Sequence, residues 1–473
     1  MSRPVPAAAL SSAFSGSPTL ASLLGKTGQR RTRGPAAALP GPVLPPHVKL
    51  GPVGTQRDQP GRLVVRTVPA EDPGDLVACL PFRQPVAWVR RGDGLVGWGE
   101  AARISIPAGE DRFTAGEKWL AELFDGAEVT DEVGLPGCGP VAFGSFTFDP
   151  TSDGSVLVVP ATTIGRSSGR SWVTTIGGAE AAAPARPLQP PAELRWHDGS
   201  LTAPQWERAV SAAVARIQAS DLDKVVLARD LYAAASATID TRVLLARLAE
   251  RYPDCWTFCC ADLVGATPEL YIRREGAAVS SLVLAGTTRR GRSEAEDRRL
   301  GAALLASAKD VGEHRFTVAD VRRALTPFCD HLDIDAQPSL LRLANVQHLA
   351  THVTGRLAAP PAPAGGAPGG HASALALAAA LHPTAAVCGT PPGAAMELIR
   401  ELEGMDRGRY AGPVGWIDAR GNGEWGIALR CAELDGSRAR LFAGCGIVAD
   451  SDPAAELAEA QSKFRAMQDA LQG

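Results

Sequence analysis

One short turn constrains the fold of this chain more than any other stretch. The segment VGWIDARGNGEWGIALRCAEL, residues 414–434, places the tripeptide GNG between two runs of strand-forming residues. A turn this short joins antiparallel strands, because parallel strands need a crossover connection of a dozen or more residues. The sequence therefore predicts a β-hairpin here, within a sheet that is antiparallel at this point.

Strand-like and helix-like segments alternate in blocks along the rest of the chain. Residues 62–178 have the pattern of successive strands separated by turns. Helical periodicity predicts helices at 204–220, 240–253, over most of 294–328, at about 392–404 and from about 453 onward. No GxxxxGK[ST] phosphate-binding loop is present. We therefore predict the α+β class rather than a doubly wound nucleotide-binding fold.

The composition excludes several classes of protein. The chain has 473 residues and a formal net charge of −3, without the basic footprint of nucleic-acid-binding proteins. Its longest apolar run, residues 374–381, is too short to span a bilayer. The nine cysteines show no paired CxxC spacing, which favours reduced thiols. We expect a cytoplasmic protein with no nucleic-acid or membrane partner, and a monomer by default.

Residues 1–57 differ in composition from the chain that follows. They contain no Asp or Glu and are rich in Ala, Pro, Ser and Gly. Organellar transit peptides are similarly poor in acidic residues, but proline is too frequent here for an amphipathic targeting helix. We expect a disordered low-complexity extension, and a start codon placed too far upstream would give the same pattern.

The helix expected at 452–464 carries three charged residues on one face. Glu456, Glu459 and Lys463 follow the spacing i, i+3 and i+7. Such a stripe is most often a solvated, ion-paired surface. The alternative is a pair of carboxylates that holds a hard cation, with the lysine on an anionic substrate. The spacing alone favours the surface interpretation.

A second acidic helix is expected in SAKDVGEHRF, residues 307–316. Asp310 and Glu313 again have the spacing i, i+3, whereas His314 points elsewhere and suits a packing or hydrogen-bonding role. A solvated face is again the simpler interpretation. Two acidic helices can also close on one Mg²⁺ from opposite sides, because Mg²⁺ needs few carboxylates beside water and substrate oxygens.

Two glycine-containing strings are expected where strands end. They are LAGTTRRG, residues 284–291, and FAGCGIV, residues 442–448. Glycine lets backbone N–H groups approach an anion closely. Each string alone is weak evidence. The second one, however, almost directly precedes the acidic helix at 452–464, which favours a single site built from both.

Two basic residues lie on expected strands. Lys224 begins the strand DKVVLAR and shares a face with Val226, and Arg430 lies behind small residues in WGIALRCAEL. Arg430 has the space to bind a carboxylate with both arms of its guanidinium. A solvated strand residue is an equal interpretation for Arg430, and by pattern alone a solvated strand end is the favoured interpretation for Lys224. His348 and His382 are more often structural than catalytic in such contexts.

Several strings together, in matching order and spacing over about 200–470, point to one family. They are DKVVLAR, GATPELYI, LAGTTRRG, KDVGEH, VQHLATHVTGRL, LHPTAAVCGTPP, RYAGPVGWIDARGNGEWGIALRCAEL and FAGCGIVADSDPAAELAEAQSK. These strings resemble the chorismate-utilising enzymes, which include isochorismate, salicylate and aminodeoxychorismate synthases and anthranilate synthase large subunits. The resemblance implies one large α+β domain of packed antiparallel β-sheets with outer helices, similar to anthranilate synthase component I.

The resemblance also implies a division of the chain. Residues 58–195 would form the β-rich N-terminal part of the globular unit, and residues 196–473 the chorismate-binding catalytic part of the same unit. Two departures from the family pattern concern loops. The family often has Thr-Pro where this chain has Thr384-Ala385, and the low-complexity segment 359–370, an expected exposed loop, is enlarged.

Lys224 indicates the branch of the family. Members that use ammonia typically lack a lysine at this position, whereas members that use water have it. The chain most resembles isochorismate synthases of the menaquinone or siderophore type. This implies Mg²⁺-dependent conversion of chorismate to isochorismate, with water attack at C2 and loss of the C4 hydroxyl. Lys224 would be the base and Glu269 the acid, and the Mg²⁺ ligands would be Glu313, Glu456 and Glu459.

The resemblance further implies a set of substrate-binding positions. They are Gly286, Thr287, His348, Tyr410, Arg430, Gly444, Gly446 and Lys463. The sequence leaves other functions open. A salicylate synthase, which also eliminates pyruvate, is the nearest alternative. Anthranilate or aminodeoxychorismate synthesis and a non-catalytic chorismate binder are more remote.

Overall fold

The hairpin predicted at 414–434 is confirmed for its first part. The computed structural model describes residues 62–179, 187–219, 222–344, 346–359 and 371–473. Strand β20 (Pro413–Asp418) pairs with β21 (Gly423–Ile427) across a turn in which Gly421 has φ +76°. The chain then leaves this sheet, and β22 (Cys431–Asp435) pairs within another. The remaining predicted hairpin residues therefore connect two sheets.

The described strands form two sheets, one of thirteen strands and one of ten. Besides β22, the first contains β1 (Val64–Ala70), β2 (Val86–Arg90), β3 (Asp93–Trp98), β5 (Glu128–Asp131), β8 (Thr162–Ser167), β9 (Arg170–Ile176), β10 (Arg195–Asp198), β11 (Lys224–Ala234), β12 (Trp256–Cys260), β13 (Leu263–Thr267), β19 (Gly389–Thr390) and β23 (Arg438–Ile447). Besides β20 and β21, the second contains β4 (Ala102–Ile106), β6 (Val141–Ser145), β7 (Ser155–Val159), β14 (Leu270–Glu275), β15 (Ala278–Arg289), β16 (Cys329–Ile334), β17 (Ser339–Arg342) and β18 (Val346–Leu357).

The strand order mixes segments that are far apart in the sequence. The first sheet runs β10-β11-β23-β22-β13-β12-β2-β3-β8-β9-β1-β5, with β19 also paired to β11. The second runs β16-β18-β15-β14-β21-β20-β6-β7-β4, with β17 paired to β18. Among the pairings described, only that of β1 with β5 is parallel. Both sheets thus contain strands from the early and the late parts of the chain, and the α+β class is confirmed.

Eight α-helices are described. They are α1 (Arg112–Asp125), α2 (Ala203–Ala219), α3 (Thr241–Arg251), α4 (Glu294–Ala306), α5 (Ala308–Leu325), α6 (Ala374–Leu381), α7 (Pro392–Leu402) and α8 (Pro453–Gln472). The helices predicted from periodicity are confirmed, with 294–328 divided into α4 and α5. The division falls at Ser307, whose side chain accepts a hydrogen bond from the Asp310 N–H and so caps α5. Helix α1 interrupts the segment predicted as strands.

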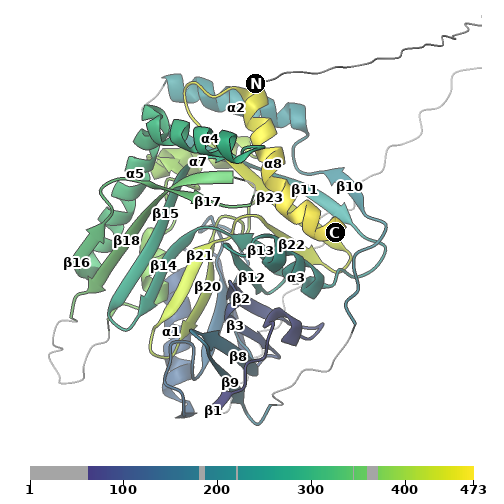
Figure 1. The fold of residues 1–473 in the computed structure, drawn as a ribbon, viewed down its shortest axis with the longest axis vertical. Coiled ribbons are helices and arrows are strands. Elements are labelled where there is room, and N and C mark those ends of the chain that lie inside the picture. Colours follow the sequence, from purple (N-terminus) through teal and green to yellow (C-terminus); the bar gives the residue numbers. More distant parts are fainter. Residues whose placement is uncertain (1–61, 180–186, 220–221, 345, 360–370) are drawn as a thin grey trace, which may run out of the picture. The chain divides into compact units, whose positions relative to one another are not determined.

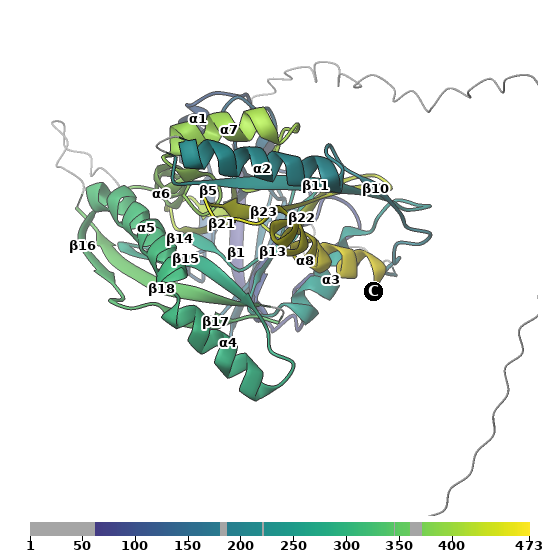
Figure 2. The same cartoon turned by 90° about the horizontal axis from the view of Figure 1, so that it is seen from above.

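Apolar side chains fill two buried clusters. The larger one packs the second sheet against the first and includes Trp88, Phe143, Phe146 and Trp425. The smaller one lies beneath α3 and α8 and includes Leu244, Leu248, Phe464 and Leu471 from these helices. Helix α8 contacts β23, α2 and α3 (Figures 1 and 2). The acidic helix is therefore held against the strand that precedes it.

Two of the sequence predictions concern residues outside the described ranges. The low-complexity extension at 1–57 lies there entirely, and the loop at 359–370 lies there except for its first residue. Among the described helices, none is both long enough and apolar enough to cross a membrane. Helix α5 packs on β15 of the second sheet, and α8 packs on β23 of the first (Figure 1). The functional site lies between these elements.

Candidate active site

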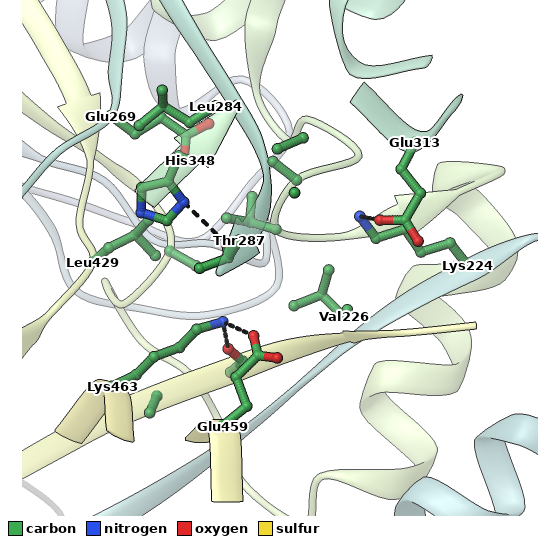
Figure 3. A pocket seen from close by; sticks show the side chains of 18 of the residues that line it. Lys224, Val226, Glu269, Leu284, Thr287, Glu313, His348, Leu429, Glu459 and Lys463 are labelled. Atoms are coloured by element: carbon green, nitrogen blue, oxygen red, sulfur yellow. Dashed lines mark hydrogen bonds and ion pairs between the residues drawn. The ribbon is translucent and has the colours of Figure 1, made fainter. Parts of the chain in front are cut away.

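A cavity of about 260 Å³ lies between β11 and β23 of the first sheet and β15 and β18 of the second (Figure 3). Helices α5 and α8 also contribute residues to its wall. All thirteen residues predicted for the site line it: Lys224, Glu269, Gly286, Thr287, Glu313, His348, Tyr410, Arg430, Gly444, Gly446, Glu456, Glu459 and Lys463. The fold thus brings the predicted set together from segments spread over 240 positions of the sequence.

Lys224 is the first residue of β11 and points into the cavity (Figure 3). Its Nζ lies 3.9 Å from Glu313 Oε2 on α5. A Cβ atom at Gly446 on the paired strand would lie only 2.7 Å from Lys224 Cε, so the glycine makes room for the lysine. Burial lowers the pKa of Lys224, against the opposing effect of Glu313. This lysine is therefore suited to act as a neutral base.

Glu269 lies between β13 and β14, and only 8% of its surface is exposed. Its backbone is fixed by hydrogen bonds from its N–H to Thr267 Oγ1 and from the Ile427 N–H to its carbonyl. Burial raises the pKa of Glu269 to about 8, although Lys224 and Arg430 act in the opposite direction. The carboxyl group therefore keeps its proton at neutral pH and can serve as an acid.

The charged face of α8 is partly exposed and ion-paired, as the surface interpretation expects, but its three charged residues also line the cavity. Lys463 Nζ lies 2.8 Å from Glu459 Oε1 and donates to the Gly444 carbonyl, also at 2.8 Å. The charge of Lys463 lowers the pKa of Glu459. Burial opposes the charge of Lys463, but Cys445 and Glu459 keep its pKa above the ordinary value. Lys463 is thus a permanent cation at neutral pH.

The carboxylates of Glu456 and Glu459 form the centre of a candidate cation site. Ligand atoms of these residues and Cys445 Sγ all lie within 4.8 Å of one another. Burial raises the pKa of Glu456, which accepts a hydrogen bond from Ser451 Oγ at 2.7 Å. Burial also raises the pKa of the Cys445 thiol, so the oxygens are the better ligands for a hard cation.

Glu313 is not a member of this close group but lines the same cavity from α5. Two neighbouring carboxylates, with a third on another wall, fit a Mg²⁺ ion whose remaining ligands are waters and substrate oxygens. The donor set is therefore compatible with the predicted metal. The identity of the metal and the assignment of these three ligands stay predictions.

The prediction that Arg430 lies on a strand is wrong. Arg430 lies between β21 and β22 with φ +48°, in the connection that carries the chain from the second sheet to the first. Its Nη2 donates to His348 Nε2 at 3.2 Å. Since arginine only donates, the proton of the neutral imidazole is on Nδ1, which lies 2.9 Å from Thr287 Oγ1. Burial lowers the pKa of His348 to about 3, so the ring stays neutral and orients the guanidinium.

Both glycine strings lie where strands end, since β15 ends at Arg289 and β23 at Ile447, but their glycines in the site are still strand residues. Gly444 and Gly446 are interior residues of β23 and pair with Ala228 and Val226 of β11. The N–H groups of Ala228 and Val226 bond to Glu403 and Cys388, away from β23. In an antiparallel ladder, two residues that form a non-hydrogen-bonded pair both point their N–H and carbonyl groups away from each other. The N–H groups of Gly444 and Gly446 therefore point away from β11 and make no hydrogen bond to it.

Gly286 and Tyr410 complete the predicted set. Gly286, with φ +76°, lies within β15 at an irregularity in its pairing with β18. The Tyr410 ring stacks on Phe442 with ring centres 5.1 Å apart. A Cβ atom at Gly444 would lie 3.1 Å from the Tyr410 hydroxyl, so this glycine gives the tyrosine access to the cavity.

The histidines expected to be structural have such roles. His314 Nε2 lies 2.7 Å from Thr351 Oγ1, and His382 Nε2 lies 2.9 Å from the Phe148 carbonyl. Sequence reasoning missed three polar residues of the cavity wall, namely Lys309, Arg407 and Ser451. Lys309 directly precedes the acidic pair of α5, and Arg407 follows Glu403 at i+4; these spacings were the available signals.

Comparisons with known proteins agree with this geometry. Residues 83–472 match the model of the family described as "Chorismate binding enzyme". A relative from Pseudomonas aeruginosa, the salicylate biosynthesis isochorismate synthase, is 44% identical over 290 residues. This match covers 60% of the present chain and 58% of the relative, which is less than two thirds of its length.

Two solved structures have a similar fold. MenF, the menaquinone-specific isochorismate synthase from Escherichia coli, has a TM-score of 0.71 and 25% identity, covering 87% of this chain and 95% of that one. Anthranilate synthase component I from Streptococcus pneumoniae has a TM-score of 0.63 and 21% identity, covering 80% and 92%, which shows the fold alone. The family model spans most of the chain, and the chain therefore belongs to the chorismate binding enzyme family.

Proposed function

We propose that the protein is a Mg²⁺-dependent isochorismate synthase, which converts chorismate to isochorismate. One observation carries the proposal. Lys224 and Glu269 reach the same cavity from different walls, and burial shifts their pKa values in opposite directions (Figure 3). At neutral pH the pair then supplies a base and an acid, which are the two groups that hydration and dehydration require.

The proposed substrate is a dicarboxylate, and the cavity wall carries groups that suit it. Arg430 and Lys463 supply positive charge, and the outward N–H groups of Gly444 and Gly446 supply donors. Glu456, Glu459 and Glu313 would hold the Mg²⁺ ion. When bound, this ion would supply positive charge for the ring carboxylate of the substrate.

In the proposed reaction, Lys224 Nζ takes a proton from water as the water oxygen bonds to C2. The ring double bonds shift, the C4–O bond breaks, and Glu269 gives its proton to the departing hydroxyl. One water enters and one leaves, so chorismate and isochorismate are isomers. Proton exchange with solvent then returns Lys224 to the neutral form and Glu269 to the acid form.

The names of the relatives support the reaction but differ in pathway. One relative acts in salicylate biosynthesis and the other is specific for menaquinone, and both are isochorismate synthases. The presence of Lys224 also favours water over ammonia as the nucleophile. The proposal therefore ends at isochorismate and includes neither pyruvate elimination nor amination.

The test is incubation of the protein with chorismate and Mg²⁺, followed by chromatography of the products. We expect isochorismate in equilibrium with chorismate and no pyruvate. Salicylate with pyruvate, formed without a separate lyase, would show a salicylate synthase instead. An aromatic product that depends on ammonia would show an anthranilate or aminodeoxychorismate synthase. Unchanged chorismate would refute every catalytic version and leave a chorismate binder.

A further inference from the structure

Beyond Val225, the outer edge of β11 has no strand partner until β10, and side chains bond part of its backbone. Strand β19 pairs only with Lys224 and Val225, and the Val226 N–H donates to the Cys388 carbonyl beyond it. Farther along, the Val226 carbonyl accepts from Arg407 Nη2 at 2.8 Å, and the Ala228 N–H donates to Glu403 Oε1 at 2.7 Å. An ion pair thus replaces the missing strand partner of β11.

This ion pair is bidentate and almost inaccessible to solvent. Arg407 Nε and Nη2 donate to the two carboxylate oxygens of Glu403 at 2.9 and 2.5 Å. The residues are 3% and 2% exposed, respectively. Arg407 Nη1 also donates to the Val387 carbonyl at 2.8 Å. Burying such an ion pair costs desolvation free energy, and well-packed apolar residues in the same place often stabilise a fold at least equally. The stability of the fold alone is therefore a poor explanation for the pair.

The ion pair holds the backbone on which the proposed base is mounted. Val226 is two residues from Lys224, and Val226, Val387 and Arg407 all line the cavity. On the other side of β11, the Lys224 side chain lies over Gly446 of β23, where a Cβ atom would be only 2.7 Å from Lys224 Cε. The reach of Lys224 Nζ therefore depends on the exact position of the β11 backbone relative to the cavity.

We propose that Arg407 and Glu403 are a positioning pair, which fixes β11 so that Lys224 Nζ meets the water at C2 of the substrate. The inference rests on the proposed function and deepens it. Arg407 acts here through backbone carbonyls and not through the substrate. Lysine in its place would keep the positive charge but lose the planar fork that reaches Glu403, Val226 and Val387 together.

The test compares Arg407→Lys with Arg242→Lys in the full chain. Arg242 is a matched control, because it forms a bidentate pair with Asp240 in α3, is 5% exposed and does not line the cavity. Misplacing a catalytic group by 1 Å can cost about 10²-fold in rate. We expect Arg407→Lys to lower kcat by about that factor, with KM for chorismate within about 3-fold.

The control should keep kcat, whatever its effect on Tm. Two kinetic outcomes would overturn the inference. One is a raised KM with unchanged kcat in Arg407→Lys, because it would show that Arg407 contacts the substrate. The other is an equal loss of kcat in both variants, because it would show general destabilisation.

A second measurement does not depend on turnover. Trace acetylation with acetic anhydride at one fixed pH, followed by mass spectrometry, gives the rate at which Lys224 is labelled relative to the other lysines. We expect Arg407→Lys to change this relative rate, because the lysine is displaced, and Arg242→Lys to leave it unchanged. If wild-type protein leaves chorismate unchanged, the proposed function fails, while this labelling still supports or overturns the positioning of Lys224.

Discussion

Two lysines line one cavity from different regions of the chain, and their pKa values are shifted in opposite directions. Lys224, at the start of β11, has its carboxylate neighbour Glu313 at 3.9 Å, and burial lowers its pKa. Lys463, in α8, touches Glu459 at 2.8 Å and also bonds a carbonyl, and its pKa is raised. Lys463 thus has a carboxylate in hydrogen-bond contact beside other raising neighbours, whereas the nearest carboxylate of Lys224 is about 1 Å farther away and the effect of burial prevails.

The carboxyl groups of Glu269 and Glu459 also have pKa values that are shifted in opposite directions. Glu269 has cationic neighbours but no ion-pair contact among the described residues, and its pKa rises to about 8. Glu459 forms an ion pair with Lys463 through Oε1, and the pKa of Glu459 is lowered. In one region of the cavity the pKa shifts therefore favour the uncharged forms of Lys224 and Glu269, and in the α8 region they favour the charged forms of Lys463 and Glu459. The first arrangement suits proton transfer, and the second suits binding of ions.

The largest expected effect comes from removing the neutral lysine. Lys224→Ala should lower kcat by about 10³-fold, because the attacking water loses its base. Lys463→Ala should mainly raise KM, because it removes a binding cation. Steady-state kinetics on both variants, with calorimetry to confirm that Lys224→Ala still binds chorismate with Mg²⁺, measures the contrast. Wild-type turnover in Lys224→Ala would show that the base is elsewhere.

The next effect concerns the neutral acid. Glu269 is active in its protonated form, so its raised pKa predicts that kcat is retained below about pH 8 and falls above it. Glu269→Gln should lower kcat by about 10²-fold and remove this alkaline limb. The measurement is kcat between pH 6 and 10 for both proteins. An alkaline limb that persists in the variant would assign it to another group.

A smaller effect is expected from the fixed charges of α8. Glu459→Gln should weaken Mg²⁺ binding by about 10-fold, because a carboxylate ligand is lost. The readout is calorimetric titration with Mg²⁺ alone, beside the Mg²⁺ dependence of turnover. Glu122→Gln on the surface of α1 is a suitable control. Equal Mg²⁺ affinity in wild type and Glu459→Gln would remove Glu459 from the ligand set.

The smallest effect comes from narrowing the space around the neutral lysine. Gly446→Ala places a methyl group 2.7 Å from the present position of Lys224 Cε, and the flexible side chain must move. We expect kcat to fall by roughly 10-fold with little change in Tm. Gly393→Ala in α7 is the control, since a Cβ there meets no atom within 4 Å. Unchanged kcat in Gly446→Ala would show that Lys224 tolerates displacement.

The residues of the site could be predicted from the sequence, but their physical properties could not. Residue type and spacing singled out Lys224 and the acidic faces of α5 and α8 but favoured solvated surfaces for them, and the family resemblance changed that preference and added Glu269. The opposite pKa shifts of Lys224 and Lys463 depend on ion-pair distances between elements, which no local pattern contains. The positioning pair was missed because Glu403 and Arg407 have the i, i+4 spacing of an ordinary surface pair.

The fold was predicted best where local patterns agree with the tertiary structure. The turn at Gly421 and the periodicity of α2 and α8 are examples. Helix α1 was missed although its buried residues Phe113, Gly116, Leu120 and Leu123 have helical spacing, because strands surround it on both sides. Arg430 was misplaced because its apolar neighbours continue a strand pattern across a point where the chain changes sheets.

The backbone at Arg430 limits how the protein can vary over evolutionary time. A φ of +48° is costly for a residue with a Cβ atom, and glycine or asparagine would relieve that cost at once. Drift toward greater stability would therefore favour losing the guanidinium. An arginine is therefore expected to persist at position 430 only under selection for its positive charge. The residue type at this position would then indicate whether a descendant of the chain still binds an anionic ligand.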